Sequence, residues 1–434
     1  MKSIRTALDR TLRLMRDDLT GGVEDSTLIS TLTGAKVVLI GDARNLSSHA
    51  AQCAYITAAL LMARSGHAVY LAAPDVPLLG QQPPLTGNRL VGALMGIGND
   101  LLPGIGFCAG MPPGDAGLAV IFGDSLSRYR AHRAIGVNAG AWRAHLGPAR
   151  QTERWAENDW PCGALAAGAL ASVEAFKVAI HGLRRLAKDT PLFDSLFAFT
   201  DRVSVEVAPF DSPRATELGR FDCVSGGAII NSALYVLSRL PGVNGRGRVI
   251  EPEAADLSNL NRYPLLRRSA SGQGKAQILK SLMPPRLELR AVPRRYEGGQ
   301  IVGLGEFAPS VLVGVDDIPT RWRVQQESPS WLGIGATTHW AAMASYHERG
   351  LGCACCLHPR DDPATVPIPT IAFVSFFAGL KLASYFVRAC GGERFRTAEQ
   401  YTYLSPLRPE HIWRSPVAVR PDCPLCQNAG IRAE

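Results

Sequence analysis

Hydrophobic positions along the chain repeat one rhythm twice, with short β-branched runs alternating with longer stretches rich in small residues. In the first half we expect strands at 36–42, 67–74, 118–124 and 134–142, and helices at 50–66 and 163–180. In the second half we expect strands at 220–227, 247–253, 287–295, 311–317 and 331–338, and helices at 228–242 and 370–389. Strands that alternate with helices are typical of βαβ units. The pattern therefore predicts an α/β protein with two mostly parallel sheets and flanking helices.

The repeat divides the chain into two expected domains, 1–195 and 196–434. A chain of 434 residues is also too long for one ordinary hydrophobic core. Pro, Asp and Ser residues in 190–220 indicate the linker between the domains, and the Pro-rich stretch 359–369 indicates a second long loop.

Two apolar segments indicate where in the cell the protein is expected. Residues 1–21 alternate Leu and Ile with Arg and Asp, which predicts an amphipathic helix rather than a signal peptide. The longest apolar run, 371–380, is too short to span a bilayer and is expected to be a buried helix. We therefore expect a cytoplasmic protein with no membrane partner.

The formal net charge is +8, with many of the positive charges on scattered arginines. An excess of positive side chains is typical of proteins that bind nucleic acid, an acidic protein or phosphate groups. The chain has no Lys/Arg tract interleaved with aromatic residues. We therefore expect no nucleic-acid partner.

A glycine turn lies where a strand of the second half meets the next helix. Gly226 and Gly227 would let backbone N–H groups approach a phosphate at the helix N-terminus, although such a pair is most often only a turn. Glu251 ends the next strand, where dinucleotide-binding sheets hold a ribose hydroxyl. By itself, Glu251 would be a solvated strand end.

The sequence SNLNR at 258–262 follows that acidic strand end and places an amide and a guanidinium beside the same expected nucleotide. Lys275 begins the following helix, and Asp316 ends a strand at the edge where open sheets bind ligands. Two cations, an acid suited to Mg²⁺ and a glycine turn are the parts of a phosphoryl-transfer site. This order predicts a phosphoryl-transfer site in the second half, with Asp316 suited to Mg²⁺.

The glycine turn, the strand-end acid, SNLNR, the lysine and VDDIPTR (315–321) together resemble the adenylating domain of ubiquitin-activating enzymes and of enzymes that activate sulfur carriers. The resemblance covers roughly 221–390. It implies a nucleotide site made of Gly226, Gly227, Glu251, Asn259, Arg262, Lys275 and Asp316. Among these, it implies catalytic roles for Arg262, Lys275 and Asp316. Arg321 is expected to be structural.

The second half departs from the family pattern at four positions. Val224 and Ile229 stand where glycines are usual, Glu251 replaces Asp, and Tyr263 replaces a common Gln. A degenerate, non-catalytic copy is therefore the alternative. The cations and the acid of the motif are all retained, which favours an active enzyme.

The first half lacks this set of residues. GDARNLSSHAAQ (41–52) follows its first strand without a glycine turn, and no SNLNR follows. It resembles the inactive adenylation domain that pairs with an active one in ubiquitin-activating enzymes, which implies a Rossmann-like pseudo-dimer within one chain. Arg5 and Arg10 could reach the phosphates, but arginines in such a helix mostly face solvent, so the predicted site omits them.

Two C-x-x-C pairs occur in the second half, Cys353 with Cys356 and Cys423 with Cys426. Two such pairs can supply four thiolates to one structural Zn²⁺, and the resemblance implies a zinc at this point. Cys355 is expected to be a bystander, and His358 is an alternative ligand. The remaining cysteines are expected to pack as small hydrophobic residues: Cys53, Cys108, Cys162, Cys223 and Cys390.

The expected crossover loop, 357–370, contains no cysteine, whereas family members that form a covalent intermediate carry a nucleophilic cysteine there. Aligning the next helix through Gly379 places Thr365 at that position. Thr365 is therefore the predicted nucleophile for an oxyester, ahead of Thr370. The alternatives are an enzyme that stops at the adenylate and a Thr365 that is only a polar loop residue.

The resemblance implies ATP-dependent adenylation of the C-terminal glycine of a ubiquitin-like protein, which then passes to a ubiquitin-conjugating-like enzyme. A fused inactive half without a cysteine-domain insertion resembles the activating enzymes of bacterial ubiquitin-like conjugation operons, which often serve antiviral defence. The alternatives are activation of a sulfur carrier or a ribosomal peptide in biosynthesis, and a non-catalytic scaffold that holds a carrier's tail.

Overall fold

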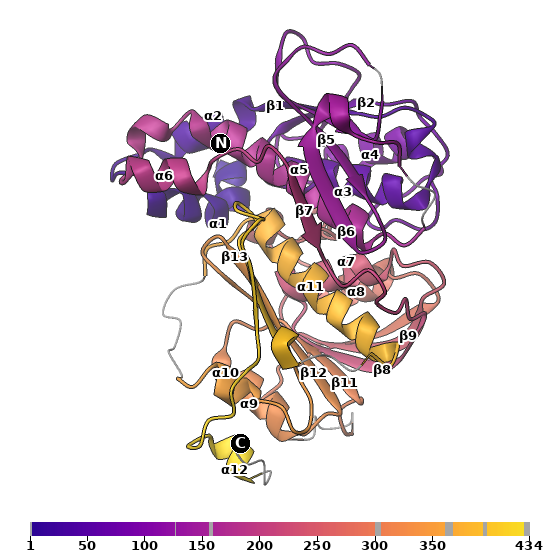
Figure 1. Ribbon diagram of the computed structural model, residues 1–434, viewed down its shortest axis with the longest axis vertical. Coiled ribbons are helices and arrows are strands. Elements are labelled where there is room, and N and C mark those ends of the chain that lie inside the picture. Colours follow the sequence, from indigo (N-terminus) through magenta and orange to yellow (C-terminus); the bar gives the residue numbers. More distant parts are fainter. Residues whose placement is uncertain are drawn as a thin grey trace.

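A computed structural model describes residues 2–125, 127–155, 159–299, 305–360, 368–393 and 397–428. Each half of the chain contributes one sheet with flanking helices, and the two halves stack along the long axis of the molecule (Figure 1). The predicted α/β class with two sheets is confirmed.

The first sheet belongs entirely to the first half of the chain. Its strands are β1 (Lys36–Ile40), β2 (Ala68–Ala72), β3 (Phe107–Ala109), β4 (Ala116–Phe122), β5 (Ala131–Ala139), β6 (Arg143–Pro148) and β7 (Val203–Glu206). The helices of this half include α1 (Lys2–Asp18), α2 (Asp25–Gly34), α3 (His49–Arg64), α4 (Leu90–Gly98), α5 (Cys162–His181) and α6 (Thr190–Leu196). The strand order is β3-β2-β1-β4-β5-β6-β7, parallel through β5 and antiparallel afterwards.

The second sheet repeats this plan. Its strands are β8 (Glu217–Val224), β9 (Asn244–Ile250), β10 (Leu287–Val292), β11 (Ser310–Val313), β12 (Trp331–Thr338), β13 (Ala341–His347), β14 (Tyr401–Leu404) and β15 (Ile412–Ser415). The helices include α7 (Ala228–Leu237), α8 (Lys275–Leu282), α9 (Ile318–Gln326), α10 (Ala354–Leu357), α11 (Ala372–Cys390) and α12 (Pro424–Asn428). The order is β10-β9-β8-β11-β12-β13-β14-β15, again parallel through β12 and antiparallel afterwards.

The two sheets therefore match strand for strand from β3 and β10 to β7 and β14. All of the strands and helices expected from the hydrophobic pattern are present at or near their predicted positions. The antiparallel strands β6, β7, β13, β14 and β15 were not predicted. Strands β6, β7, β14 and β15 are short or carry polar residues on one face, so they lack the continuous apolar run of a doubly covered parallel strand. Strand β13 is mostly buried, but its sequence, AAMASYH, has no β-branched residue.

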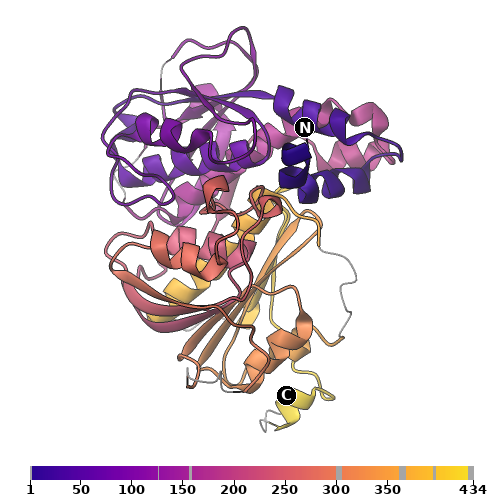
Figure 2. The same ribbon diagram turned by 180° about the vertical axis from the view of Figure 1, so that it is seen from behind.

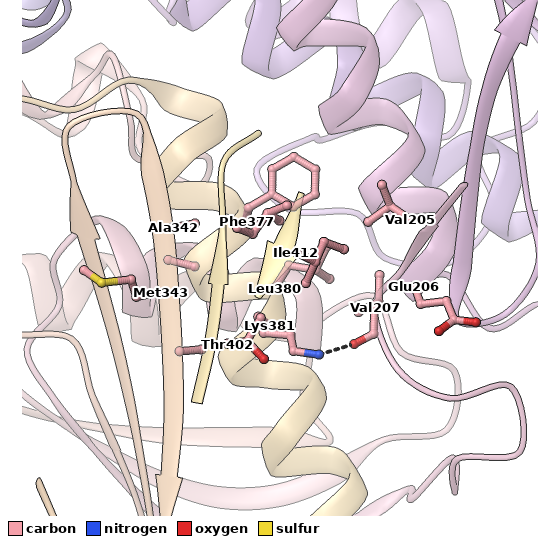
Figure 3. Close-up of a pocket in the computed structure, with 13 residues that line it drawn as sticks. Val205, Glu206, Val207, Ala342, Met343, Phe377, Leu380, Lys381, Thr402 and Ile412 are labelled. Carbon is pink, nitrogen blue, oxygen red and sulfur yellow. Dashed lines mark hydrogen bonds between the residues drawn. The ribbon is translucent and has the colours of Figure 1, made fainter. Parts of the chain in front are cut away.

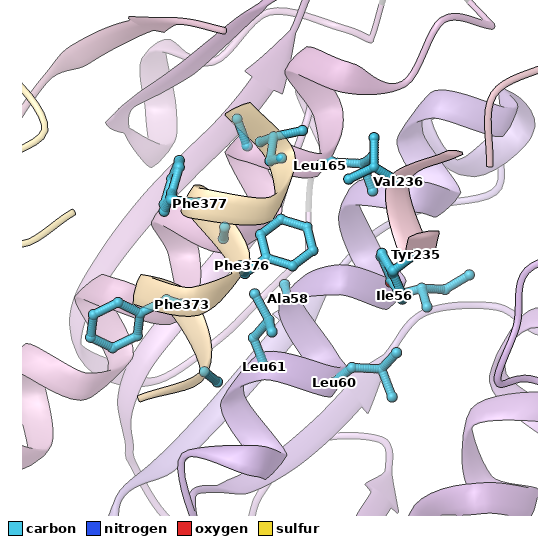
Figure 4. Packing of buried hydrophobic residues seen from close by; sticks show 14 of the residues in the cluster. Ile56, Ala58, Leu60, Leu61, Leu165, Tyr235, Val236, Phe373, Phe376 and Phe377 are labelled. Atoms are coloured by element: carbon cyan, nitrogen blue, oxygen red, sulfur yellow. The ribbon is translucent and has the colours of Figure 1, made fainter. Parts of the chain in front are cut away.

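Four apolar helices fill the space between the sheets: α3 and α5 from the first half, and α7 and α11 from the second (Figure 4). Phe376 of α11, Leu61 of α3 and Tyr235 of α7 meet in one cluster of buried side chains that runs through both halves. A helix that is buried on all sides is apolar all round. This position explains why these helices show no polar face in the sequence.

A glycine allows the close crossing of helices within each half. A Cβ atom on Gly168 of α5 would lie 2.4 Å from the carbonyl oxygen of Ala54 in α3. A Cβ atom on Gly379 of α11 would lie 2.5 Å from the carbonyl oxygen of Ile229 in α7. Both distances are too short for any side chain, so the repeat extends to the packing of its helix pairs.

The predicted linker, 190–220, is wrong in part. It contains α6, the edge strand β7 and the start of β8. Because β7 pairs with β6, the first sheet extends to Glu206, past the predicted boundary at 195/196. Next to β7, the Nζ of Lys381 in α11 donates to the carbonyl oxygen of Val207 (2.8 Å) across a small apolar cavity between the halves (Figure 3).

Helix α1 lies beside the first half and above the second, where it contacts the 3₁₀ turn η4 (Leu257–Asn259; Figure 2). Its apolar face is buried, as predicted for an amphipathic helix. By length and composition, α5 and α11 could each cross a membrane, but 94% and 83% of their most apolar windows are buried inside the protein. The predicted buried helix at 371–380 is confirmed within α11.

Candidate functional site

A cleft of about 800 Å³ opens beyond the carboxyl ends of β8, β9 and β11. Its lining includes these predicted nucleotide-site residues: Gly227, Glu251, Asn259, Arg262, Lys275 and Asp316. Gly226 lies directly behind them, since its N–H group donates to the Oε2 atom of Glu251 (2.7 Å). The fold thus brings the whole predicted set together, from five separate segments of the second half.

The glycine turn between β8 and α7 uses its own N–H groups internally. Gly226 donates to Glu251, and Gly227 donates to the Oγ atom of Ser225 (2.9 Å). The two groups predicted to approach a phosphate therefore already have acceptors. Ala228 and Ile229, at the N-terminus of α7, line the cleft instead, and the first N–H groups of a helix favour an anion.

Close packing explains why glycine occupies this turn. A Cβ atom on Gly226 would lie 3.0 Å from the Cγ atom of Glu251 and 3.3 Å from the Cβ atom of Lys275. Ser225 adopts φ of 98°, which is strained for a residue other than glycine. Such strain persists only where the surrounding structure demands it, as at a binding turn.

Glu251 is nearly buried, and its carboxylate is held by two backbone groups, the N–H of Gly226 and the N–H of Glu253 (2.9 Å to Oε1). Each carboxylate oxygen keeps a further lone pair, because one oxygen accepts two hydrogen bonds. Glu251 therefore presents fixed acceptors to the cleft, as a ribose hydroxyl requires.

The SNLNR loop, which we define as residues 256–266, begins with a cap on η4. Asp256 Oδ1 accepts from the N–H of Ser258 (2.6 Å), and Asn259 Oδ1 accepts from the N–H of Asp256 (3.0 Å). The paired bonds hold Asn259 at the cleft wall. The cap explains why Asp256 and Asn259 are three residues apart.

The second asparagine of the motif has a different task. Asn261 is fully buried, and its Nδ2 donates to Thr11 Oγ1 of α1 (2.9 Å) and to the carbonyl oxygen of Thr370 (3.4 Å). Its Oδ1 accepts from Arg262 Nη1 (2.9 Å), which also donates to the carbonyl oxygen of Ser258. Asn261 thus orients the guanidinium that lines the cleft.

Lys275 faces the cleft at the start of α8, with its Nζ 2.5 Å from Glu253 Oε2. Burial lowers the pKa of Lys275, but Tyr263, the bond to Glu253 and the nearby Glu251 outweigh burial and raise it above the usual value. The ammonium is therefore charged at neutral pH. It offers a fixed cation to a phosphate.

Asp316 lines the cleft one residue before Asp317, whose Oδ2 caps α9 by accepting from the N–H of Thr320 (2.8 Å). Buried Arg321 donates from Nε and Nη2 to the carbonyl oxygen of Val315 (3.2 and 2.9 Å). Its Nη1 lies 3.1 Å from Nε2 of His358. These contacts fix the backbone next to Asp316, which agrees with the structural role predicted for Arg321.

Arg10 of α1 also lines the cleft, although the predicted site omits it. Its Nη1 donates to the carbonyl oxygen of Ile368 (3.2 Å). Burial and then the charge of Arg262, which lines the same cleft, lower the pKa of Arg10. Arg5, in contrast, pairs with Asp25 at the surface of the first half (2.5 Å). The helical pattern of 1–21 could not separate the two arginines.

The four predicted metal ligands converge, with all four thiol sulfurs within 4.8 Å of one another. The Sγ–Sγ distances include 3.4 Å for Cys353–Cys423, 3.5 Å for Cys356–Cys426 and 3.7 Å for Cys353–Cys356. Four sulfurs around Zn²⁺, each at about 2.3 Å, would lie about 3.8 Å apart. The cluster therefore has the size and chemistry of a closed zinc site. It lies at the end of the second half remote from the first half, where α10 and α12 meet (Figure 1).

The alternative ligand, His358, bonds to Arg321 and is not in the cluster, and Cys355 lies outside the set as predicted. Burial, then the charge of Arg321, lowers the pKa of His358 to about 3. Among the remaining cysteines, the packing prediction is confirmed for the fully buried Cys53, Cys162 and Cys223. Cys390 is only partly buried. Cys108 is exposed on β3, an edge strand, so its prediction is wrong.

Thr365 falls outside the described residues. Thr370, the second-ranked hydroxyl, is buried and lines the cleft, with its Oγ1 3.1 Å from Ser375 Oγ.

The first half fills the position that corresponds to the glycine turn. After β1, Asp42 Oδ1 accepts from the N–H (2.7 Å) and Nδ2 (3.1 Å) of Asn45. Asn45 Nδ2 also donates to Asp124 Oδ1 (2.8 Å), and its Oδ1 accepts from the N–H of Trp155 (3.1 Å). The side chain of Asn45 is buried between two carboxylates. The space that a glycine turn would leave open after β1 is therefore occupied by Asn45 and its acidic partners, and the nearest cation of the turn, Arg44, lies 3.9 Å from Asp124.

Comparisons with known proteins give one family match and one curated relative. Residues 36–196 match the BilD N-terminal domain family. The uncharacterized protein y4jF of Sinorhizobium fredii is 30% identical over 203 residues, 46% of this chain and 38% of y4jF. The chain thus spans well under half the length of that relative.

Solved structures show more distant likeness. A crystal structure of E. coli MccB with ATP is 12% identical and covers 67% of this chain and 97% of that one, with a TM-score of 0.42. A crystal structure of PaaA is also 12% identical and covers 46% of this chain and 73% of that one, with a TM-score of 0.36.

Proposed function

We propose that the chain is an adenylating enzyme, in which the second half binds Mg²⁺–ATP and activates the C-terminal carboxylate of a protein or peptide. One observation carries the proposal. Glu251, Asn259, Arg262, Lys275 and Asp316 come from separate segments and line one cleft at the carboxyl ends of parallel strands. Ligands of open α/β sheets bind at that edge.

The side chains suit this reaction. The partner's carboxylate oxygen attacks the α-phosphorus of ATP, the bond to the bridging oxygen breaks, and pyrophosphate leaves with the electron pair. Arg262 and Lys275 offset the charge that develops on the phosphates. Glu251 holds the ribose. Asp316 would bind Mg²⁺, which supplies further charge neutralisation when bound.

The finer proposal is that the partner is a ubiquitin-like protein ending in glycine, which passes to a ubiquitin-conjugating-like enzyme in a bacterial pathway, with antiviral defence as its role. The match of 36–196 to the BilD N-terminal domain, which belongs to bacterial ubiquitin-like conjugation, supports this assignment. Activation of a sulfur carrier or a ribosomal peptide is the second candidate, because the proposed reaction requires only a nucleotide and a C-terminal carboxylate. We also propose that the four-cysteine cluster holds a structural zinc.

The covalent step stays a prediction. After adenylation, the carrier either forms an oxyester on Thr365 or passes directly from the adenylate to a partner protein. A hydroxylamine-labile adduct formed with ATP and the carrier, and lost in Thr365→Ala, would support the first.

Partner-dependent exchange of pyrophosphate into ATP tests the proposal. Loss of one strong electrostatic contributor to a transition state typically costs about 10²–10³ in rate. Arg262→Ala and Asp316→Ala should therefore each slow exchange by that factor while the protein stays folded. Asp124→Ala is the matched control, because Asp124 follows β4 as Asp316 follows β11, and it should leave the rate unchanged. Near-normal exchange in both second-half variants would mean that the nucleotide binds elsewhere.

A further inference from the structure

The last residue of α3 reaches from the first half into the second. Arg64 is fully buried, and its Nη1 donates to the carbonyl oxygen of Leu260 (2.7 Å). Its Nη2 donates to the carbonyl oxygens of Pro264 (3.1 Å) and Leu266 (2.5 Å). All three acceptors belong to the SNLNR loop, and they flank Arg262. One guanidinium of the first half therefore grips the backbone on both sides of the cleft-lining arginine.

A buried guanidinium is expensive, because the charge loses its hydration and here gains only carbonyl partners among the described residues. An apolar side chain would fill the same volume at lower cost. What Arg64 adds is geometry: a planar group with several donors holds three carbonyl oxygens in one arrangement, which a lysine ammonium cannot reproduce. The residue therefore fixes the shape of the loop.

Two further contacts tie this region to the first half. Asp100, just after α4, accepts from the N–H (2.8 Å) and the Oγ (2.5 Å) of Ser269, and its carbonyl oxygen accepts from the N–H of Arg268 (2.7 Å). Thr11 of α1 accepts from Asn261. Contacts from α1, α3 and the end of α4 thus surround the loop. Within the second half, Asn231 Oδ1 accepts from the N–H of Leu265 (2.9 Å).

We propose that Arg64 is a positioning residue: by clamping the SNLNR loop, it makes nucleotide binding by the second half depend on the first half. This inference rests on the proposed function, because it assumes that Asn259 and Arg262 contact ATP. The clamp gives the first half a role although Asn45 fills its own turn. The first half forms part of the frame of the nucleotide site in the second half.

The test compares Arg64→Lys with Arg239→Lys in the full-length chain. Arg239 is the matched control, because it is also buried, lies two residues after the core helix α7 and bridges the halves, donating to the carbonyl oxygen of Pro83 (2.6 Å). It does not contact the SNLNR loop in the described structure. Two readouts are measured on both variants: the Kd for ATP by calorimetry, and hydrogen exchange of backbone amides in 257–266 without nucleotide.

Arg64→Lys should weaken ATP binding about tenfold, the value of one charge-assisted hydrogen bond. It should also speed exchange in 257–266, whereas Arg239→Lys should lower the melting temperature with less than a twofold change in Kd. Equal changes in Kd for both variants, or unchanged loop exchange in Arg64→Lys, would overturn the proposal.

If the wild-type protein binds no ATP, the proposed function fails, and the exchange measurement still decides whether Arg64 holds the loop. If Arg64→Lys does not fold, Arg64→Met takes its place, because an apolar side chain of similar volume avoids the cost of a buried charge but cannot donate to the carbonyl oxygens of Leu260, Pro264 and Leu266. Faster exchange in 257–266 would then support the clamp, and unaltered exchange would contradict it.

Discussion

The two halves have the same strand order and the same pair of core helices but opposite chemistry at the ends of their first strands. After β8, a glycine turn and Glu251 border an open cleft with Arg262 and Lys275 on its wall. After β1, Asn45 fills the corresponding turn between two carboxylates. The comparison teaches that the fold supplies only the position of a site. A few side chains at the strand ends decide whether the position binds an anion.

The comparison also shows that the halves are not independent. The first half places Arg10 in the cleft of the second, holds the SNLNR loop through Arg64 and Thr11, and holds the residues just after that loop through Asp100. The second half carries the four-cysteine cluster at its remote end, away from this interface. Catalysis is therefore expected to depend on both halves, and metal-dependent stability on one.

The largest expected effect is the loss of the metal, and of the stability that it gives, from the second half. Cys353→Ser and Cys423→Ser should each release one zinc per chain and lower the free energy of unfolding by at least about 4 kcal/mol, because a structural metal contributes its binding energy to folding. Elemental analysis and urea unfolding measure both effects. Cys108→Ser, an exposed thiol of the first half, should change neither. Freshly purified protein that contains no zinc, with no chelator used, would contradict the metal assignment.

The next effect tests whether the helix pairs are equivalent. Gly168→Ala and Gly379→Ala each place a Cβ atom within 2.4 or 2.5 Å of a carbonyl oxygen of the partner helix. Overpacking of this kind costs about 1–3 kcal/mol, and we expect similar losses from both variants. Gly96→Ala in α4, where nothing lies within 4 Å, is the control and should stabilise slightly. A lower free energy of unfolding in only one of the two variants would show that the repeat does not extend to helix packing.

A smaller effect concerns the contact between the halves and depends on pH. Both ring nitrogens of His49 face carbonyl oxygens, Nε2 that of Arg239 (2.7 Å) and Nδ1 that of Leu79 (3.1 Å), so the ring must be doubly protonated to donate to both. The neighbouring Cys53 is the main reason that the pKa of His49 is raised to about 9.

Because the folded pKa exceeds the unfolded value of about 6.5, the contribution of His49 is complete below about pH 6.5 and is lost as the pH rises through about 9. Over this pH range we expect the free energy of unfolding to fall by roughly 1 kcal/mol, after allowing for solvent screening. Urea midpoints at pH 6, 8 and 10 measure it, and His49→Gln should flatten the profile. An identical decline in that variant would assign the effect to another group.

The sequence allowed much of the site to be predicted, because its residues sit at strand ends that hydrophobic runs mark out. Glu251, Lys275 and Asp316 each follow or begin such an element. The cysteine pairs were also visible, since C-x-x-C spacing is local. In each case the signal lies within a few residues of the group itself.

Other features depend on contacts between distant segments and leave no local signal. Arg64 lies in an apolar helix and meets its acceptors some 200 residues later, at Leu260 to Leu266. Arg10 faces the cleft only because α1 packs on η4. β7 pairs with β6 across α5, so the stretch that contains it looked like a linker. Such features require the packed structure of both halves.

The number of nucleotides bound per chain tests the central claim, that a repeated fold carries a single working site. Calorimetry with Mg²⁺–ATP on the full-length chain should give one ATP per chain, with binding lost in Lys275→Ala and unchanged in Asp124→Ala. Two bound nucleotides per chain, or binding that survives Lys275→Ala and disappears in Asp124→Ala, would contradict the assignment of the site to the second half.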